Sequence, residues 1–190
     1  TLIGINKIES PNYLFIDLKL SSIVNPGEVE ILFRRNKKIE LRYKYKLLER
    51  DYKSIYRRGF SAKDVIYLIT PDRYANGNPN NDSVYSLKEK SNRKDKDGRH
   101  GGDLQGIMEN LDYIEEMGFT QIWLNPILEN DQPKLSYHGY STTDYYNIDP
   151  RYGSNDIYRE LSRRAKDKNI GLIKDIILNH IGSEHWWMKD

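Results

Sequence analysis

The stretch DIILNH, residues 175–180, is an apolar run that ends in Asn179 and His180. Together with the residues just before it, this stretch predicts a buried strand from Ile170 to Leu178. α/β barrels place ligand-binding side chains at the carboxyl ends of such strands. Asn179 and His180 stand at that position, although the same residue types could also serve only to cap the strand.

The region before this strand alternates between strand and helix patterns. Residues 65–69 form a continuous apolar run of the kind that parallel sheets bury on both faces, and residues 121–124 predict the next strand. Asp103 can cap a helix that ends at Gly118, and a second helix covers residues 155–168. The alternation predicts an α/β fold with right-handed crossovers. The first helix is expected to bury Leu104, Ile107, Leu111 and Ile114.

Residues 1–56 have a different pattern, which predicts β-structure. Short strands are expected at residues 13–18, 29–33 and 39–47, and residues 25–27 form a turn signal. The third strand alternates apolar and charged residues, as in a half-buried strand. We therefore expect part of a β-sandwich over residues 1–56, with further strands upstream, and the α/β region over residues 57–190. The chain starts at Thr1 rather than Met, so we expect it to belong to a longer polypeptide.

Composition excludes several classes of function. The 190 residues carry a net charge of only +2, which implies no acidic or basic partner. No apolar run approaches the roughly 20 residues of a membrane span, and the absence of cysteine says nothing about compartment. The lysines and arginines of residues 88–99 are mixed with acidic residues and lack an aromatic platform, so we expect no nucleic-acid partner.

A long polar loop, residues 72–102, separates the first apolar run from the first helix. Its Asn- and Asp-rich part at residues 76–82, with Gly101 and Asp103 downstream, offers several oxygen ligands at short spacing. Calcium takes six to eight such ligands from carboxylates, amides and backbone carbonyls. The same residue types also form ordinary polar turns, so spacing alone leaves both interpretations open.

A second loop, residues 137–150, follows the strand at residues 121–124 and is rich in tyrosine. Tyrosine rings and histidine donors suit the apolar faces and hydroxyls of a sugar. His138 and Tyr140, which flank Gly139, are the stronger candidates for binding. For Tyr145, Tyr146 and Tyr152 we favour a packing role.

Taken together, these segments resemble the α-amylase family of glycoside hydrolases. DIILNH is similar to the signature at the third barrel strand, and YHGYSTTDYYNIDPRYG, residues 137–153, is similar to the substrate-stacking loop. Residues 57–82 and HGGDLQGI, residues 100–107, are most similar to the neopullulanase and cyclomaltodextrinase branch. The resemblance implies the N-terminal part of a TIM barrel, with about three strands, preceded by part of a β-sandwich.

The resemblance also implies roles for individual residues. Tyr140 would stack under the sugar at the cleavage site, His180 would hydrogen-bond its hydroxyls, and His138 would lie nearby. Asp175 would be a structural support rather than the nucleophile, and would need a charged or hydrogen-bonded partner such as an arginine from a later strand. Asn179 would be a second support, although it ligates calcium in some relatives. A calcium site would be formed by Asn76, Asn78, Asn81, Asp82, the Gly101 carbonyl and Asp103, with Asn78 standing where relatives often have Asp.

The implied function is a retaining hydrolase of α-glucans such as starch, pullulan or cyclodextrins. The family's catalytic carboxylates follow the fourth, fifth and seventh strands, so we expect none in this chain and no activity from this chain alone. The alternative is a non-catalytic carbohydrate-binding or regulatory protein on the same scaffold. An open part-barrel is compatible with a homo-oligomer, and a calcium site slightly favours a periplasmic or secreted location.

Overall fold

The computed structural model describes residues 1–56 and 59–188, and the chain divides into two compact units. The first unit covers residues 1–59 and the second covers residues 60–189. The predicted boundary between residues 56 and 57 adjoins residues 57–58, which lie outside the described residues. Among the described helices, none combines the length and the apolar character that a membrane span requires.

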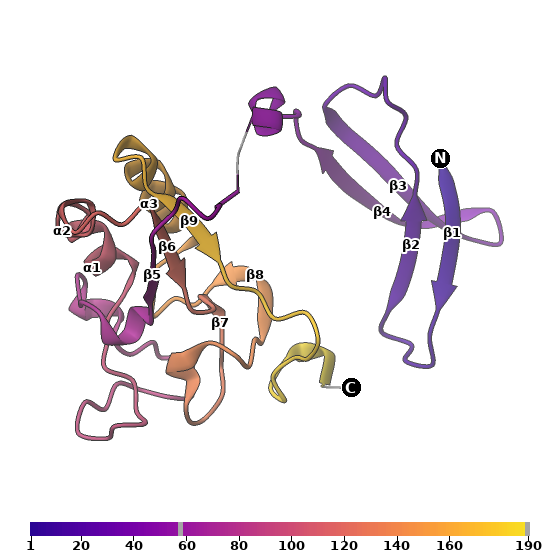
Figure 1. Ribbon diagram of the computed structural model, residues 1–190. Coiled ribbons are helices and arrows are strands. Elements are labelled where there is room, and N and C mark those ends of the chain that lie inside the picture. The colour runs from indigo at the N-terminus through magenta and orange to yellow at the C-terminus, as the bar shows by residue number, and fades with distance from the viewer. Residues whose placement is uncertain (57–58, 189–190) are drawn as a thin grey trace. The chain divides into compact units, whose positions relative to one another are not determined.

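The first unit consists of two antiparallel hairpins (Figure 1). Strand β1, Leu2–Lys7, pairs with β2, Leu14–Leu18, and strand β3, Gly27–Arg35, pairs with β4, Lys38–Leu47. β2, β3 and β4 were predicted, whereas β1 was not. The turn between β3 and β4 places Asn36 and Lys37 at positive φ, as two-residue hairpin loops require.

Strand β4 is less buried than its alternating pattern suggested. Leu41, Tyr43 and Tyr45 are 55%, 54% and 46% exposed. They lie opposite Phe33, Ile31 and Val29 on one face of the hairpin, while salt bridges such as Arg42–Glu30 lie on the other. The hairpin is therefore amphipathic, and much of its apolar face is exposed among the described residues.

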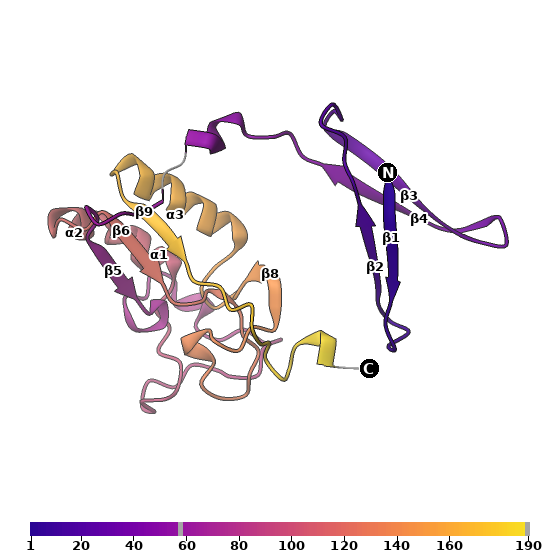
Figure 2. The ribbon, with the colours of Figure 1, turned by 45° about the vertical axis from the view of Figure 1, so that its right-hand side comes forward.

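The second unit is built on a parallel sheet in the order β5-β6-β9. Its strands are β5, Ile66–Ile69, β6, Gln121–Leu124, and β9, Gly171–Lys174. Each connection contains helix, as parallel pairing demands, and α3 packs against β9 and α1 (Figure 2). The predicted α/β arrangement is therefore present. The helices are α1, Leu104–Glu109, α2, Leu111–Glu116, and α3, Asn155–Asp167.

The first predicted helix is interrupted at Asn110. This residue has φ −106° and ψ 15°, and its side-chain Nδ2 donates to the Gly106 carbonyl at 2.7 Å. The predicted cap is confirmed, since the Asp103 carboxylate accepts from Gly106 N at 2.7 Å. The predicted apolar face is also confirmed, because Leu104, Ile107, Leu111 and Ile114 are all at most 2% exposed.

The strand predicted at residues 170–178 is shorter in the structure, where β9 ends at Lys174. Lys174 pairs with Leu124, the last residue of β6, and Pro126 follows without an N–H to extend the ladder. Residues 175–180 therefore continue beyond the sheet. The tyrosine-rich region also contains an unpredicted antiparallel pair, β7, Leu128–Glu129, and β8, Asp144–Ile148. Short 3-10 turns occur at Tyr52–Tyr56, Pro71–Arg73, Pro79–Asn81, Ser136–His138 and Trp186–Met188.

Candidate functional site

Tyr140 is the centre of a polar and aromatic site beyond the carboxyl ends of β6 and β9. Its backbone N donates to His138 Nδ1 at 2.9 Å, and His180 Nε2 lies 2.8 Å from its carbonyl oxygen. Its hydroxyl donates to Asp175 Oδ2 at 3.2 Å. Both polar backbone groups and the hydroxyl of Tyr140 are thus held, while the residue remains 36% exposed. The structure brings together all three predicted sugar-binding residues.

Asp175 joins this site to the sheet. Its Oδ2 also accepts from Trp123 Nε1 at 3.2 Å, so one carboxylate oxygen receives donors from β6 and from the Tyr140 loop. The expected hydrogen-bonded partner of Asp175 is therefore an indole and a phenol among the described residues. Burial, followed by the charge of Asp175 and the hydrogen bond to it, raises the pKa of Tyr140. The hydroxyl consequently remains a donor over a wide pH range. Asn179 is exposed.

Trp123 had not been singled out from the sequence. It lies between Ile122 and Leu124, which are both fully buried, so its side chain points to the opposite face of the strand and is 37% exposed. A large aromatic residue one position before the carboxyl end of a strand is the signal that could have identified it.

The backbone of the loop is fixed by a glycine and a tyrosine. Gly139 has φ +81°, and a Cβ at this position would lie 1.9 Å from the Pro126 carbonyl oxygen, so the turn that presents Tyr140 requires glycine. The Tyr145 hydroxyl lies 2.6 Å from the Ile177 carbonyl oxygen and 2.9 Å from that of His180, which holds the segment after β9. The packing role expected for Tyr145 and for the buried Tyr152 fits this geometry. It is wrong for Tyr146, which is 77% exposed because it lies on the outward side of β8.

His138 contacts Tyr140 through its ring as well as through Nδ1, with ring centroids 5.7 Å apart. Burial lowers the pKa of His138, and the nearby Glu89 carboxylate opposes part of this shift. The bond from Tyr140 N requires an unprotonated Nδ1, and burial favours that neutral form. His138 therefore supports the loop in its neutral state.

The polar loop at residues 76–82 folds against the start of α1. The fully buried Asp103 carboxylate accepts from Gly77 N at 3.1 Å, from Asn78 N at 2.9 Å and from Asn81 Nδ2 at 3.3 Å, in addition to its helix cap. Asn76 Nδ2 donates to Asp82 Oδ1 at 2.6 Å. The predicted metal-binding residues are therefore gathered in one place.

Two amide oxygens in this loop match what a hard cation needs. Asn76 Oδ1 and Asn81 Oδ1 are buried and have no hydrogen-bond partner among the described residues. Gly101 lies against Asp82, since a Cβ on Gly101 would be 2.6 Å from the Asp82 carboxylate. Unpaired buried oxygens beside carboxylates are the donor set that calcium prefers, so these residues fit a calcium ion.

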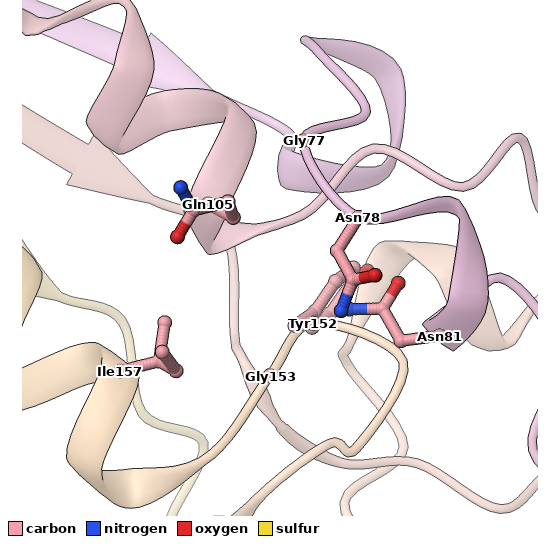
Figure 3. Close-up of a pocket in the computed structure, with 7 residues that line it drawn as sticks. All are labelled: Gly77, Asn78, Asn81, Gln105, Tyr152, Gly153 and Ile157. Carbon is pink, nitrogen blue, oxygen red and sulfur yellow. The ribbon is translucent and has the colours of Figure 1, made fainter.

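Two further observations show which groups of this loop could ligate a cation. No group of three or more His, Cys, Asp or Glu side chains that could hold a metal occurs in the described part of the chain, so amides and a carbonyl would have to complete the set. Asn78 Oδ1 accepts from Asn80 N at 3.2 Å and caps a 3-10 turn. Asn78, Asn81, Gln105 and Tyr152 are among the residues that line a pocket of about 270 Å³. Figure 3 shows the Asn78 and Asn81 side chains pointing toward each other at this pocket.

Parallel strands in sequential order, with helical connections and a polar, aromatic site beyond their carboxyl ends, are typical of (β/α)-barrel proteins. The family model described as the catalytic domain of alpha amylase matches residues 68–190, and the model described as the N-terminal region of cyclomaltodextrinase matches residues 1–51. The chain belongs to the alpha-amylase family. The predicted fold class, a partial TIM barrel preceded by part of a β-sandwich, agrees with both matches.

Individual relatives agree with this assignment. The chain is 45% identical to a beta/alpha-amylase of Paenibacillus polymyxa over 64% of its length, and 38% identical to neopullulanase 2 of Thermoactinomyces vulgaris over 69%. An Anoxybacillus alpha-amylase structure is 43% identical over 66% of the chain, with a TM-score of 0.59. A cyclic α-maltosyl-(1→6)-maltose hydrolase from Arthrobacter globiformis is 34% identical over 65%, with a TM-score of 0.54. The predicted neopullulanase and cyclomaltodextrinase resemblance is confirmed.

The chain spans only a small part of these relatives. It covers 10% and 22% of the two curated proteins, and 26% and 27% of the two solved chains.

The pKa of His138 predicts a pH dependence of the Tyr140 loop. In the folded protein the pKa of His138 is lowered below its ordinary value near 6.5. The stability that His138 contributes to the fold is therefore complete above pH of about 6.5 and is lost as pH falls through the folded-state pKa. We expect the NMR titration midpoint of His138 to lie below that of free histidine, with Tyr140 signals shifting at the same midpoint.

His138→Asn provides the matched control, since its Oδ1 can accept from Tyr140 N without titrating. The Tyr140 shift near the His138 midpoint should disappear in this variant. A Tyr140 titration that persists in His138→Asn would show that another group controls the loop.

Proposed function

We propose that this chain is part of a retaining glycoside hydrolase that acts on α-glucans such as starch, pullulan, cyclodextrins or maltooligosaccharides. The observation that carries the proposal is Tyr140, whose backbone N, carbonyl and hydroxyl are each held while its residue remains partly exposed beside His180. Relatives named neopullulanase and cyclomaltodextrinase support the same class of substrate.

In this proposal Tyr140 offers an apolar ring face to a sugar. His180 Nε2 donates to the Tyr140 carbonyl, which leaves its other ring nitrogen, Nδ1, to hydrogen-bond the sugar hydroxyls. Fixing Tyr140 through Asp175, His138 and His180 removes conformational freedom before the substrate arrives, which lowers the entropic cost of binding. Glycosidic cleavage passes through an oxocarbenium-like state in which the ring is distorted. A rigid platform beside a fixed hydrogen-bonding group can favour that distorted ring over the relaxed one.

Asp175 acts in this proposal as a support rather than as a nucleophile. Its Oδ2 already accepts from Trp123 and Tyr140, which fixes the carboxylate against the sheet. Retaining glycosidases need two carboxyl groups roughly 5 Å apart on either side of the bond. We propose that this pair comes from strands other than β5, β6 and β9.

We further propose that calcium binds the loop at residues 76–82. The ion would be held by Asn76 Oδ1, Asn81 Oδ1, the Asp82 and Asp103 carboxylates and the Gly101 carbonyl. The Asn78 side chain is already used, since its Oδ1 accepts from Asn80 N. When bound, the ion would supply positive charge to two carboxylates and fix the loop against α1.

The hydrolase is tested with His180→Ala in the full-length protein. If His180 contacts the distorted sugar, the substitution lowers kcat more than it raises KM, on the order of tenfold to a thousandfold for one lost hydrogen bond. Turnover of maltohexaose and of pullulan is measured alongside the thermal midpoint. Tyr146→Ala, at a well-exposed tyrosine of the same region, is the control and should behave as wild type.

An unchanged kcat with a lowered thermal midpoint would mean that His180 only supports its own segment. Tight binding of maltooligosaccharides by the wild-type protein without turnover would instead favour a non-catalytic carbohydrate-binding protein.

Calcium binding is tested by calorimetric titration of protein stripped with a chelator. Asp82→Ala should abolish most of the binding heat, whereas Asn80→Ala, at an exposed side chain of the same loop, should leave it in place. Calcium at 100 times its Kd should add about 2.7 kcal/mol to the free energy of unfolding. Equal calcium affinity in wild type and Asp82→Ala would place the ion elsewhere.

A further inference from the structure

Arg99 is a buried cation that contacts the surroundings of two loops. These are residues 76–82, the proposed calcium loop, and residues 137–150, the Tyr140 loop. Arg99 is 1% exposed, and no role was assigned to it from the sequence. It follows the exposed residues 93–97 and precedes the glycines that lead into Asp103. Burying a guanidinium is costly unless surrounding groups compensate, so its contacts indicate what it does.

On one side Arg99 contacts Asp72, which holds the backbone of Gly101, one of the proposed calcium ligands. Its Nε lies 3.8 Å from Asp72 Oδ1. The same Asp72 carboxylate accepts from His100 N at 2.8 Å and from Gly101 N at 3.2 Å. Asp72 therefore holds the backbone that carries the Gly101 carbonyl, and Arg99 is its buried cationic neighbour.

On the other side Arg99 contacts Ser136 and Tyr152, which lie next to the turn that presents Tyr140. Its Nη1 donates to Ser136 Oγ at 3.2 Å, and Ser136 is fully buried at the start of the turn that ends at His138. The guanidinium also lies 4.6 Å from the centroid of the Tyr152 ring, whose hydroxyl donates to the Tyr137 carbonyl at 2.5 Å. Both contacts reach the residues immediately before His138 and Tyr140.

The hydrogen bonding of Arg99 is incomplete. Its Nε and Nη2 are buried and have no hydrogen-bond partner among the described residues. A buried charged donor without a partner is destabilising, and an apolar side chain of similar length would fill the same space without that cost. Burial opposes the charge of Arg99, but Tyr152, Asp149, Asp72 and Glu89 outweigh this effect and raise its pKa, so the guanidinium stays charged while it contacts both loops.

We propose that Arg99 is a positioning residue that couples the calcium loop to Tyr140. The inference rests on the proposed function, because it links the two sites proposed there. Movement of the backbone at residues 99–103 on cation binding would be passed through the guanidinium to Ser136 and Tyr152, and so to the turn that presents Tyr140. By linkage, calcium and glucan would each strengthen the binding of the other by the same factor.

The test is a double-mutant cycle in the full-length protein at saturating calcium. Arg99→Met, Tyr140→Ala and the double variant are compared for kcat on maltohexaose and for Kd of maltotriose. Arg99→Met alone should reduce kcat or weaken Kd on the order of tenfold through misplacement of Tyr140. Added to Tyr140→Ala, it should change either quantity by no more than about twofold.

Two controls keep the cycle interpretable. Arg163→Met removes an exposed arginine of α3 that pairs with Glu160 and Asp167, outside residues 99–103 and the Tyr140 loop, and it should match wild type. Arg99→Lys keeps a buried positive charge but lacks the planar guanidinium. It should recover part of the loss, and it serves as the test variant if Arg99→Met does not fold.

Calcium affinity provides the second readout. In wild type, saturating maltotriose should tighten calcium binding at least about fivefold, and this effect should be lost in Arg99→Met. Equal losses from Arg99→Met with and without Tyr140, or a lower thermal midpoint with unchanged kcat and Kd, would overturn the proposal.

Different results would contradict the proposed function itself. Absence of calcium binding in wild type would remove the calcium site and, with it, the coupling proposed for Arg99. Absence of turnover would remove the hydrolase, while the cycle in Kd would still decide whether Arg99 positions Tyr140.

Discussion

The α/β unit depends most on the buried carboxylate of Asp103. It caps α1 through Gly106 N and also accepts from Gly77 N, Asn78 N and Asn81 Nδ2. A carboxylate at a helix N-terminus is favoured by the exposed N–H groups and by the helix dipole. The same interaction folds residues 76–82 back onto the helix, at a contact so close that a Cβ on Gly77 would lie 2.4 Å from Gly106 N.

From this anchor the structure leads to the candidate site through neighbouring contacts. Leu104 N, next to Asp103, donates to the Tyr152 carbonyl at 3.1 Å. The Tyr152 hydroxyl holds the Tyr137 carbonyl, and the turn that follows presents Tyr140. The loop proposed to bind calcium, residues 76–82, and the Tyr140 loop, residues 137–150, are 55 residues apart from Asp82 to Tyr137 and share one buried polar cluster. For this reason we propose that cation binding and sugar binding are coupled.

Features that depend on local chemistry could be predicted from the sequence. The Asp103 cap and the apolar face of α1 and α2 follow from residue type and spacing, and β6 was placed with its observed bounds. Features that depend on a distant partner could not. β9 stops at Lys174 because β6 supplies no further partner, and no local pattern records that. The Asp175–Trp123 hydrogen bond joins residues on different strands, so neither residue predicts the other.

We propose that Tyr140, held by Asp175, His138 and His180, is the sugar platform of an α-glucan hydrolase. The most direct measurement is a crystal structure of the full-length protein with a maltooligosaccharide bound in the presence of calcium. The account predicts a glucose ring stacked on Tyr140, with a hydroxyl within hydrogen-bonding distance of His180. A bound oligosaccharide that leaves the Tyr140 ring uncovered and His180 without a sugar contact would contradict it.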